Sequence, residues 1–191
     1  MSGTGLNALL FLVSCIFDFY ILILFVRLIL AFVHADYYHP LTQFVVKCTS
    51  FLVTPLRKFI PDVRGVETAT LVLILLIVLL KWIMLILMSY GIPNLLGLFI
   101  LMIGDTLKLM LEILSLAFIF QAILSWVQPA SPVYQVLNKC TSPMTSPLHK
   151  VIPPISGIDI TPLIAIIVLQ LLVIILASPI IAYGLAVAIG S

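Results

Sequence analysis

Long apolar runs alternate with short polar connections along the whole chain. Four runs exceed the roughly 18 residues that a bilayer-spanning helix needs, and they predict spans at about 6–33, 68–90, 100–127 and 163–188. A soluble core cannot bury so many apolar helices of this length. The pattern therefore predicts an all-α integral membrane protein with four transmembrane helices.

Polar residues mark where the second and fourth spans begin. Thr68 is expected to cap the second span, and Asp159 shortly before Pro162 is typical of a helix start. In the fourth span Pro179 predicts a kink, beside Ser178, whose hydroxyl can satisfy a freed backbone group. The third run extends back to residue 95, which makes it about 50 Å long. Residues 95–104 are therefore either a separate interfacial piece or a tilted extension of the third span.

A shorter amphipathic segment lies between the two spans of each half, at residues 41–61 and 131–153. In the first one, apolar side chains such as Phe44 and Cys48 recur at helical spacing, and Lys47 lies off their stripe. This stripe is too short to cross a membrane, so both segments are expected to lie in the interface. Pro55 and Pro61 are expected to bracket a basic turn at the end of the first.

The two amphipathic segments belong to an internal repeat. Residues 40–71 and 132–163 align without a gap at an offset of 92, with 13 of 32 positions identical, where unrelated sequences would share roughly two. We therefore predict two repeats, residues 1–92 and 93–191. Because each repeat has two spans, an even number, both should lie in the membrane in one orientation, as parallel repeats.

The basic residues are distributed unevenly along the chain, which is 63% hydrophobic and 8% charged. The formal net charge is only +2, so the charge balance gives no reason to propose nucleic acid as a partner. The N-terminal tail, the connection at 88–104 and the C-terminus contain no Lys or Arg. The positive-inside rule therefore places both amphipathic connections in the cytoplasm and both termini in the periplasm. Six of the nine Lys and Arg residues lie in these connections: Lys47, Arg57, Lys58, Arg64, Lys139 and Lys150.

These basic side chains also predict a surface that binds anionic lipid head groups or partner proteins. His149 replaces Arg57 in the second repeat and is counted with them, and so is Arg27, which is expected to snorkel from the end of the first span. A homo-oligomer is a further possible assembly.

Five charged residues are expected to lie inside the membrane: Asp18, Lys81, Asp105, Lys108 and Glu112. An ionisable group at this depth costs several kcal/mol, so it should face a partner or water. One hypothesis is an ion or proton path lined by Asp18 and Glu112, which match each other at an offset of 94. The alternative is structural pairing, either along one face of the third span, where positions 105, 108 and 112 neutralise one another, or between Lys81 and Asp18.

No catalytic or cofactor-binding pattern accompanies these features. The three cysteines show no CxxC spacing, and the three histidines have no partner arrangement typical of catalysis or of a metal site. No phosphate loop or glycine-rich dinucleotide signature is present. We therefore expect no cofactor, no metal and no enzymatic activity. The run around Cys15 fits a lipobox, but it has no preceding basic residue and continues past Cys15, so the first span is expected to stay as an anchor.

The repeat resembles the YggT/YlmG family of bacterial and plastid membrane proteins over nearly the whole chain. Three positions depart from the pattern: Gln121 stands where Arg27 does, Ala31-Phe32 where Ser125-Trp126 does, and Glu67 where Asp159 does. The residues that carry the resemblance are Arg27, Pro55, Arg57, Lys58, Pro61 and Gly65 in the first repeat, and Trp126, Pro143, Pro147, Lys150, Pro153, Gly157, Asp159 and Pro162 in the second.

The resemblance implies a protein of the bacterial inner membrane that is linked to osmotic-shock tolerance and potassium homeostasis. Some relatives look like organisers of membrane processes, such as cytochrome assembly in plastids or nucleoid distribution at division. Two functions remain open at this point. The first is a non-enzymatic membrane organiser or assembly factor, and the alternative is an oligomeric pathway for potassium, protons or an osmolyte.

Overall fold

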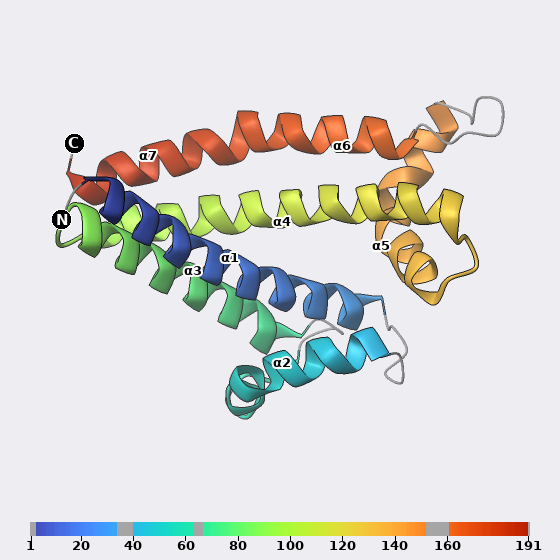
Figure 1. Ribbon diagram of the computed structural model, residues 1–191, viewed down its shortest axis with the longest axis horizontal. Helices are drawn as coiled ribbons and strands as arrows, with labels where there is room; N and C mark the ends of the chain where they lie inside the picture. The colour runs from blue at the N-terminus through green and yellow to red at the C-terminus, as the bar shows by residue number, and fades with distance from the viewer. Residues whose placement is uncertain (1–2, 34–39, 63–66, 152–160, 191) are drawn as a thin grey trace.

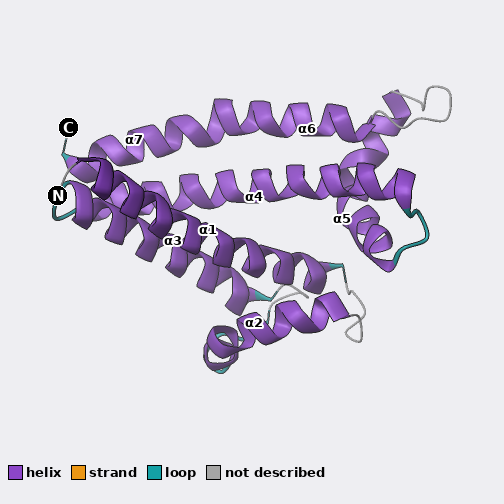
Figure 2. Cartoon of the chain, viewed as in Figure 1, coloured by secondary structure: helices purple, strands orange, loops and turns teal. Residues whose placement is uncertain are grey.

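A computed structural model describes residues 3–33, 40–62, 67–151 and 161–190, and every regular element in these ranges is a helix (Figures 1 and 2). This confirms the predicted all-α class. Four helical stretches are long and apolar enough to cross a membrane. The elements in chain order are α1 (Gly3–Phe32), α2 (Pro40–Arg57), α3 (Thr68–Ser89), α4 (Leu95–Val127), α5 (Pro132–Val151), α6 (Thr161–Leu172), the π-helical stretch η1 (Val173–Ala177) and α7 (Ser178–Ile189).

Four long rods run in alternating directions: α1, α3, α4 and the continuous α6–η1–α7 (Figure 1). Both chain termini lie at one end of the bundle, which we call the terminal end. The helices α2 and α5 lie at the other, the α2/α5 end. Because α1 and α4 both begin at the terminal end, the two halves have the same orientation, as the even number of spans predicted.

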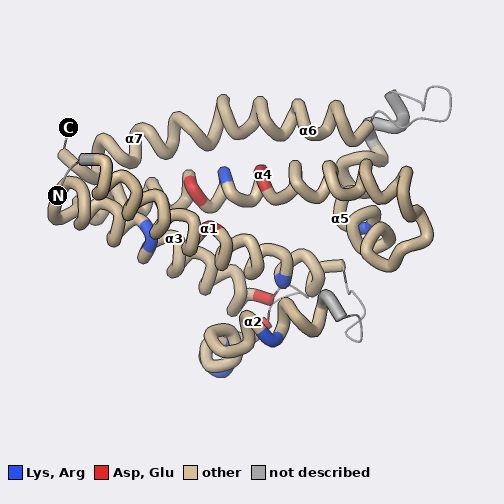
Figure 3. Tube along the Cα trace, in the orientation of Figure 1, with Lys and Arg blue, Asp and Glu red and all other residues tan. Residues whose placement is uncertain are grey.

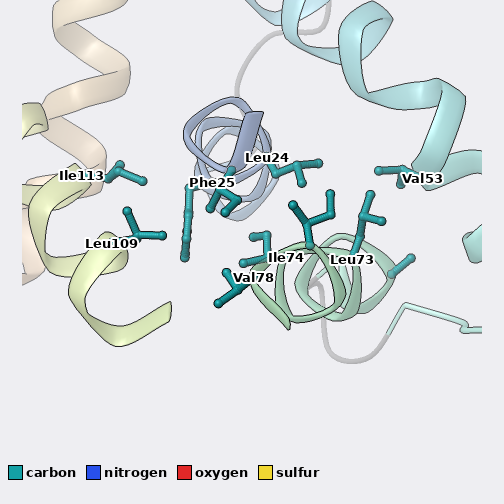
Figure 4. Close-up of a cluster of buried hydrophobic side chains, with 11 residues drawn as sticks. Leu24, Phe25, Val53, Leu73, Ile74, Val78, Leu109 and Ile113 are labelled. Carbon is teal, nitrogen blue, oxygen red and sulfur yellow. The ribbon is translucent and has the colours of Figure 1, made fainter. Parts of the chain in front are cut away.

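The first repeat packs around one apolar cluster. Leu24 and Phe25 of α1 face Ile74 and Val78 of α3, while Val53 of α2 closes the cluster at one side (Figure 4). Leu109 and Ile113 of α4 reach the same cluster from the second repeat. The two repeats therefore share a core along α1, α3 and α4, and α2 is attached to it through its buried side chains.

Glycines allow α4 and α7 to approach closely near the terminal end. A Cβ placed on Gly97 would lie 2.2 Å from the backbone nitrogen of Ala188, and one on Gly184 would lie 2.9 Å from that of Leu101. The amide of Asn94 also donates a hydrogen bond to the carbonyl of Ala188 at 2.9 Å. Small residues at such crossings bring helix backbones together in membranes, where packing drives association.

The structure settles the open question about residues 95–104. They form the first turns of α4, which is one helix of 33 residues, so they extend the third span and do not form a separate piece. The side chain of Asn94 accepts a hydrogen bond from the amide of Leu96 at 3.0 Å and caps this helix. An N-cap at this position explains why the helix begins directly after the turn at residues 91–93.

Two other predicted boundaries are corrected. Pro55 does not end the first amphipathic helix, because α2 includes it and continues to Arg57; the proline is exposed. Thr68 is not the cap of α3. Glu67 occupies the N-cap position, and the Thr68 hydroxyl instead donates to the carbonyl of Pro61 at 2.6 Å.

The fourth rod stays helical through Pro179. A π-helical stretch, Val173–Ala177, precedes the proline, and the Ser178 hydroxyl donates to the carbonyl of Val173 at 3.0 Å. That carbonyl also accepts the Ser178 amide, so this bond is not made to a carbonyl that Pro179 leaves free, whereas the sequence predicted such a bond for Ser178. The wider turn accommodates a residue that has no amide hydrogen to donate.

Candidate functional site

The first polar cluster ties α2 to the spans of the first repeat. Arg27 of α1 donates two hydrogen bonds to Glu67, from Nε at 2.7 Å and from Nη2 at 2.8 Å, which is the bidentate geometry favoured by guanidinium and carboxylate. Its Nη1 donates to Thr49 Oγ1 on α2 at 2.8 Å. Arg27 is buried, so the expectation that it snorkels and belongs to a lipid-binding surface is wrong. One donor of this side chain instead holds α2, and the other two hold Glu67 at the start of α3.

The charge of Glu67 is held by its surroundings. Burial alone would raise the pKa of this carboxyl, but hydrogen bonds from Arg27 and Thr70, together with the positive charges of Arg27 and Arg57, outweigh it and lower the pKa below its ordinary value. Thr70 Oγ1 donates to Glu67 Oε2 at 2.6 Å, and Arg57 Nη1 of α2 lies 3.6 Å from Oε1. Glu67 therefore acts as the anionic centre that joins α1, α2 and α3.

The second repeat makes the equivalent attachment with neutral groups. Thr141 of α5, the repeat partner of Thr49, donates to Gln121 Oε1 on α4 at 2.6 Å. Gln121 Nε2 donates to Asn138 Oδ1 at 3.2 Å. Gln121 occupies the position of Arg27, so both repeats fix their amphipathic helix through the same pair of positions. In the second repeat this bond carries no charge.

The helix α2 presents three different faces. Thr42, Val45, Thr49 and Val53 are buried against the bundle. Phe44 is 61% exposed and Phe51 84% exposed, so a second apolar face has no partner among the described residues. Lys47 is exposed and lies next to these aromatics on the helical wheel, at 100° per residue, and Lys58 is exposed in the turn that follows α2.

The predicted basic surface is retained in part. Lys47, Lys58 and Lys139 are exposed, whereas Arg57 is about half exposed and pairs with Asp62. The side chains of Pro147, His149 and Lys150 lie outside the described residues, as do Arg64, Gly65, Pro153, Gly157 and Asp159 entirely. Among the other motif residues, Pro61 and Trp126 are exposed and Pro162 is buried in the first turn of α6.

The second polar cluster lies inside the bundle and joins three spans. Lys81 Nζ of α3 lies 2.7 Å from Asp18 Oδ1 of α1 and 2.5 Å from Asp105 Oδ2 of α4. Trp82 Nε1 also donates to Asp105 Oδ2 at 3.0 Å. We call Asp18, Lys81 and Asp105 the central triad. The pairing of Lys81 with Asp18, one of the sequence-based alternatives, is present, and Asp105 joins them.

The remaining two embedded charges pair with each other. Lys108 Nζ lies 3.6 Å from Glu112 Oε1, one turn along α4, and both side chains are about 40% exposed. Of the pairing expected along one face of the third span, the Lys108–Glu112 part is therefore present, whereas Asp105 pairs with Lys81 instead. Figure 3 shows the charged positions of α1, α3 and α4 away from the helix ends, while α6 and α7 have none.

An apolar groove of about 330 Å³ lies between the two repeats near the α2/α5 end. Its walls come from α1 and α4, and α2 and α5 contribute Thr42, Val136 and Cys140. Asp18 and Glu112 do not line it, and they bind different lysines. In the described residues these two carboxylates therefore do not share this groove.

Thiol and metal chemistry find little support in the described part of the chain. Burial raises the pKa of Cys140 to about 11, so its thiol stays protonated at neutral pH. Within the described ranges no group of three His, Cys, Asp or Glu residues could hold a metal ion.

Sequence reasoning did not identify the partners of Arg27 and Gln121. Glu67 aligns with the motif carboxylate Asp159, and this alignment is a signal that it binds the motif arginine, Arg27. Thr49 and Thr141 were identical repeat positions whose side chains were assigned no role. Both contacts could be found by pairing a polar position of the connection that recurs in the two repeats with a polar position of the preceding span.

Comparisons with known proteins agree with this architecture. A family model described as CCB3/YggT matches residues 6–88 and 100–181, one segment in each half. An uncharacterized protein of Pseudomonas aeruginosa is 37% identical over 173 residues, which cover 88% of this chain and 88% of that protein. The uncharacterized protein YggT of Escherichia coli K12 is 32% identical over 171 residues, covering 87% and 88%. No solved structure matches the chain.

Proposed function

Because this chain belongs to the CCB3/YggT family, we propose that it is a non-enzymatic organiser of the bacterial inner membrane, whose helices α2 and α5 bind anionic lipid head groups and thereby gather partner proteins. The observation that carries the proposal is the unused apolar face of α2. Phe44 and Phe51 are exposed beside Lys47 and Lys58, while the opposite face is fixed to the bundle by Arg27 and Thr49.

This combination suits a helix that lies in the membrane interface. Aromatic side chains enter the acyl boundary, and lysines at the edge of the polar face reach the head groups. Each Lys or Arg near an anionic membrane surface contributes about 1 kcal/mol to binding. Lys139 gives α5 an exposed charge at the same end of the bundle, so the two helices act on one membrane surface.

The orientation follows from the distribution of charge. Every exposed lysine that we assign to lipid binding is on α2, in the turn that follows it, or on α5, whereas the turn between α3 and α4 contains no Lys or Arg. The positive-inside rule favours a cytoplasmic α2/α5 end and periplasmic termini. The anionic lipids would then be those of the cytoplasmic leaflet.

An ion or osmolyte pathway is less well supported. The embedded charges are paired within the bundle, and the groove between the repeats is lined by apolar side chains together with Thr42 and Cys140. A binding role at the α2/α5 end, by contrast, gives a function to the exposed aromatic and lysine side chains there, which lack partners among the described residues.

A complementation experiment tests the function. In a strain that lacks the protein and is sensitive to hyperosmotic shock, the unaltered chain should restore growth, and Lys47→Gln/Lys58→Gln/Lys139→Gln should not. The matched control Lys47→Arg/Lys58→Arg/Lys139→Arg keeps the charges and should restore growth. Membrane abundance of each variant is measured by immunoblot. Full growth with the glutamine variant at equal abundance would contradict the proposed role of these lysines.

A further inference from the structure

The ion pair of Lys108 and Glu112 lies deep in the membrane. The helix α4 runs from Leu95 to Val127, so at 1.5 Å per residue each of the two side chains is roughly 20 Å or more from either end of the helix. The hydrocarbon core of a bilayer is about 30 Å thick, so a helix about 50 Å long holds this pair within it. Charged side chains at such a depth normally face the interior of a bundle or a water-filled cavity.

Both charged side chains are nevertheless exposed at the surface of the bundle. Lys108 is 39% exposed and Glu112 is 41% exposed, whereas Lys81 of the central triad is 5% exposed and is bound by carboxylates from two other spans. The 3.6 Å between Lys108 Nζ and Glu112 Oε1 is longer than a hydrogen bond. Among the described residues neither group has another partner for an ion pair or a hydrogen bond. A single copy therefore turns this pair toward lipid with most of its hydrogen-bonding capacity unused.

An exposed stripe of α4 continues from this pair toward the α2/α5 end. At 100° per residue Lys108 and Glu112 are about 40° apart on the helical wheel, and Ile119 lies midway between them. Ile119 is 41% exposed and Ile123, close to it on the wheel, is 48% exposed. Toward the terminal end the stripe is covered, since Leu101 has the same angle as Ile119 and is fully buried. We call Lys108, Glu112, Ile119 and Ile123 the α4 stripe.

The α4 stripe is complementary to itself. A two-fold axis along the membrane normal places the α4 helix of a second copy parallel to the first, with the same charges at the same depths. Lys108 of each copy can then reach Glu112 of the other, one helical turn further along, and the four alternating charges sum to zero. The same axis brings Ile119 of one copy next to Ile119 of the other. A different protein would need both charges at matching depths, whereas a second copy carries them there by symmetry.

We propose that the α4 stripe is the interface of a homodimer, in which the α4 helices of two copies lie parallel and exchange ion pairs between Lys108 and Glu112. Hydrogen bonds and packing between helices drive association in a membrane, where no hydrophobic effect acts between them. The dimer removes the charged pair from lipid and gives each charged group a second partner. Its two-fold axis keeps the α2/α5 ends of both copies at one membrane surface. This interface goes beyond the lipid-binding role of α2 and α5 and does not depend on it.

Cysteine cross-linking tests where the two copies meet. In a background with Cys15, Cys48 and Cys140 replaced by serine, Ile119→Cys should form a disulfide-linked dimer when the purified protein is oxidised with copper phenanthroline. The protein is placed in phosphatidylcholine vesicles, which lack anionic lipid, so the result is independent of lipid binding by α2 and α5. The matched control Met110→Cys is 47% exposed, lies on the opposite side of α4 and should stay monomeric. No cross-link at Ile119→Cys, or equal cross-linking of the two variants, would overturn the interface.

Energy transfer between labelled copies in the same vesicles tests the exchange of ion pairs. Donor and acceptor dyes are attached in separate preparations to Ile92→Cys, in the exposed turn between α3 and α4. Lys108→Gln and Glu112→Gln should each self-associate about tenfold more weakly than the protein with both charges, because like charges then face each other. A mixture of the two variants should recover the association, because opposite charges meet again. Undiminished self-association of the single variants, or no recovery in the mixture while circular dichroism shows both to be folded, would overturn the proposal.

Discussion

Arg27 Nη1 of α1 donates a hydrogen bond to Thr49 Oγ1 of α2 across 2.8 Å, and this bond joins a buried span to the helix that lies across its end. In the second repeat Gln121 and Thr141 meet in the same way at 2.6 Å. The attachment is thus a property of both repeats, and within the described residues Arg27 differs from Gln121 in also forming a buried ion pair.

Replacing Arg27 by the residue of the second repeat tests the importance of the charge. Arg27→Gln leaves Glu67 buried without its bidentate partner, so we expect a loss of about 3–5 kcal/mol in the free energy of unfolding. Arg27→Gln/Glu67→Gln should lose less, because it removes the uncompensated charge. Chemical unfolding in detergent measures both. Strictly additive effects would mean that the pair contributes no coupling.

Acid should weaken this attachment. The pKa of Glu67 is lower in the folded protein than its ordinary value near 4.5, so its stabilising effect is fully present above that pH. It is lost as the pH falls through the lower, folded pKa. The thermal midpoint of the unaltered protein should therefore drop more steeply below about pH 4.5 than that of Glu67→Gln. Equal slopes for the two proteins would contradict the role of Glu67.

The crossing of α4 and α7 should tolerate no added volume. In Gly97→Ala the new methyl would meet the backbone of Ala188 at 2.2 Å, so the helices must separate, at a cost of about 1–3 kcal/mol. Gly5→Ala, at an exposed position of α1, is the matched control and should not destabilise the protein. Thermal unfolding monitored by circular dichroism compares them. An unchanged midpoint for Gly97→Ala would show that the crossing is looser than described.

The apolar runs and the repeat were enough to predict the four spans, their parallel arrangement and the two short helices between them. These features depend on length and periodicity along the chain, which a sequence displays directly. The boundaries were less certain because local contacts decide them. The helix α2 continues through Pro55, whose side chain is exposed, and α4 begins at residue 95 because Asn94 caps it.

The partners of the buried charges were harder to predict, because they depend on how each helix is rotated about its axis. Lys81 lies between Asp18, 63 residues before it, and Asp105, 24 residues after it. Helical spacing alone placed Asp105 with Lys108 and Glu112, and it could not show that α3 approaches the face of α4 that bears Asp105. The burial of Arg27 could not be predicted for the same reason, since its partner Glu67 precedes a different span.

The orientation in the membrane can be measured by cysteine labelling. In a background with Cys15, Cys48 and Cys140 replaced by serine, Ile92→Cys lies in the exposed turn at the terminal end and should react with an impermeant maleimide added outside the inner membrane. Lys58→Cys and Lys139→Cys should react only after the membrane is permeabilised. Outside labelling of Lys58→Cys with protection of Ile92→Cys would reverse the proposed orientation.

The central claim is that α2 and α5 bind anionic lipid, and energy transfer from the protein to labelled lipid measures this most directly. A donor dye at Ile92→Cys would be too far from the relevant surface, so the donor is placed at Thr54→Cys, an exposed position of α2, in the cysteine-free background.

The acceptor is a labelled phosphatidylglycerol or, in parallel vesicles, a labelled phosphatidylcholine at the same density. Transfer to phosphatidylglycerol should exceed transfer to phosphatidylcholine, and Lys47→Gln/Lys58→Gln/Lys139→Gln should remove the excess while the arginine variant keeps it. Equal transfer to the two lipids by the unaltered protein would contradict the account.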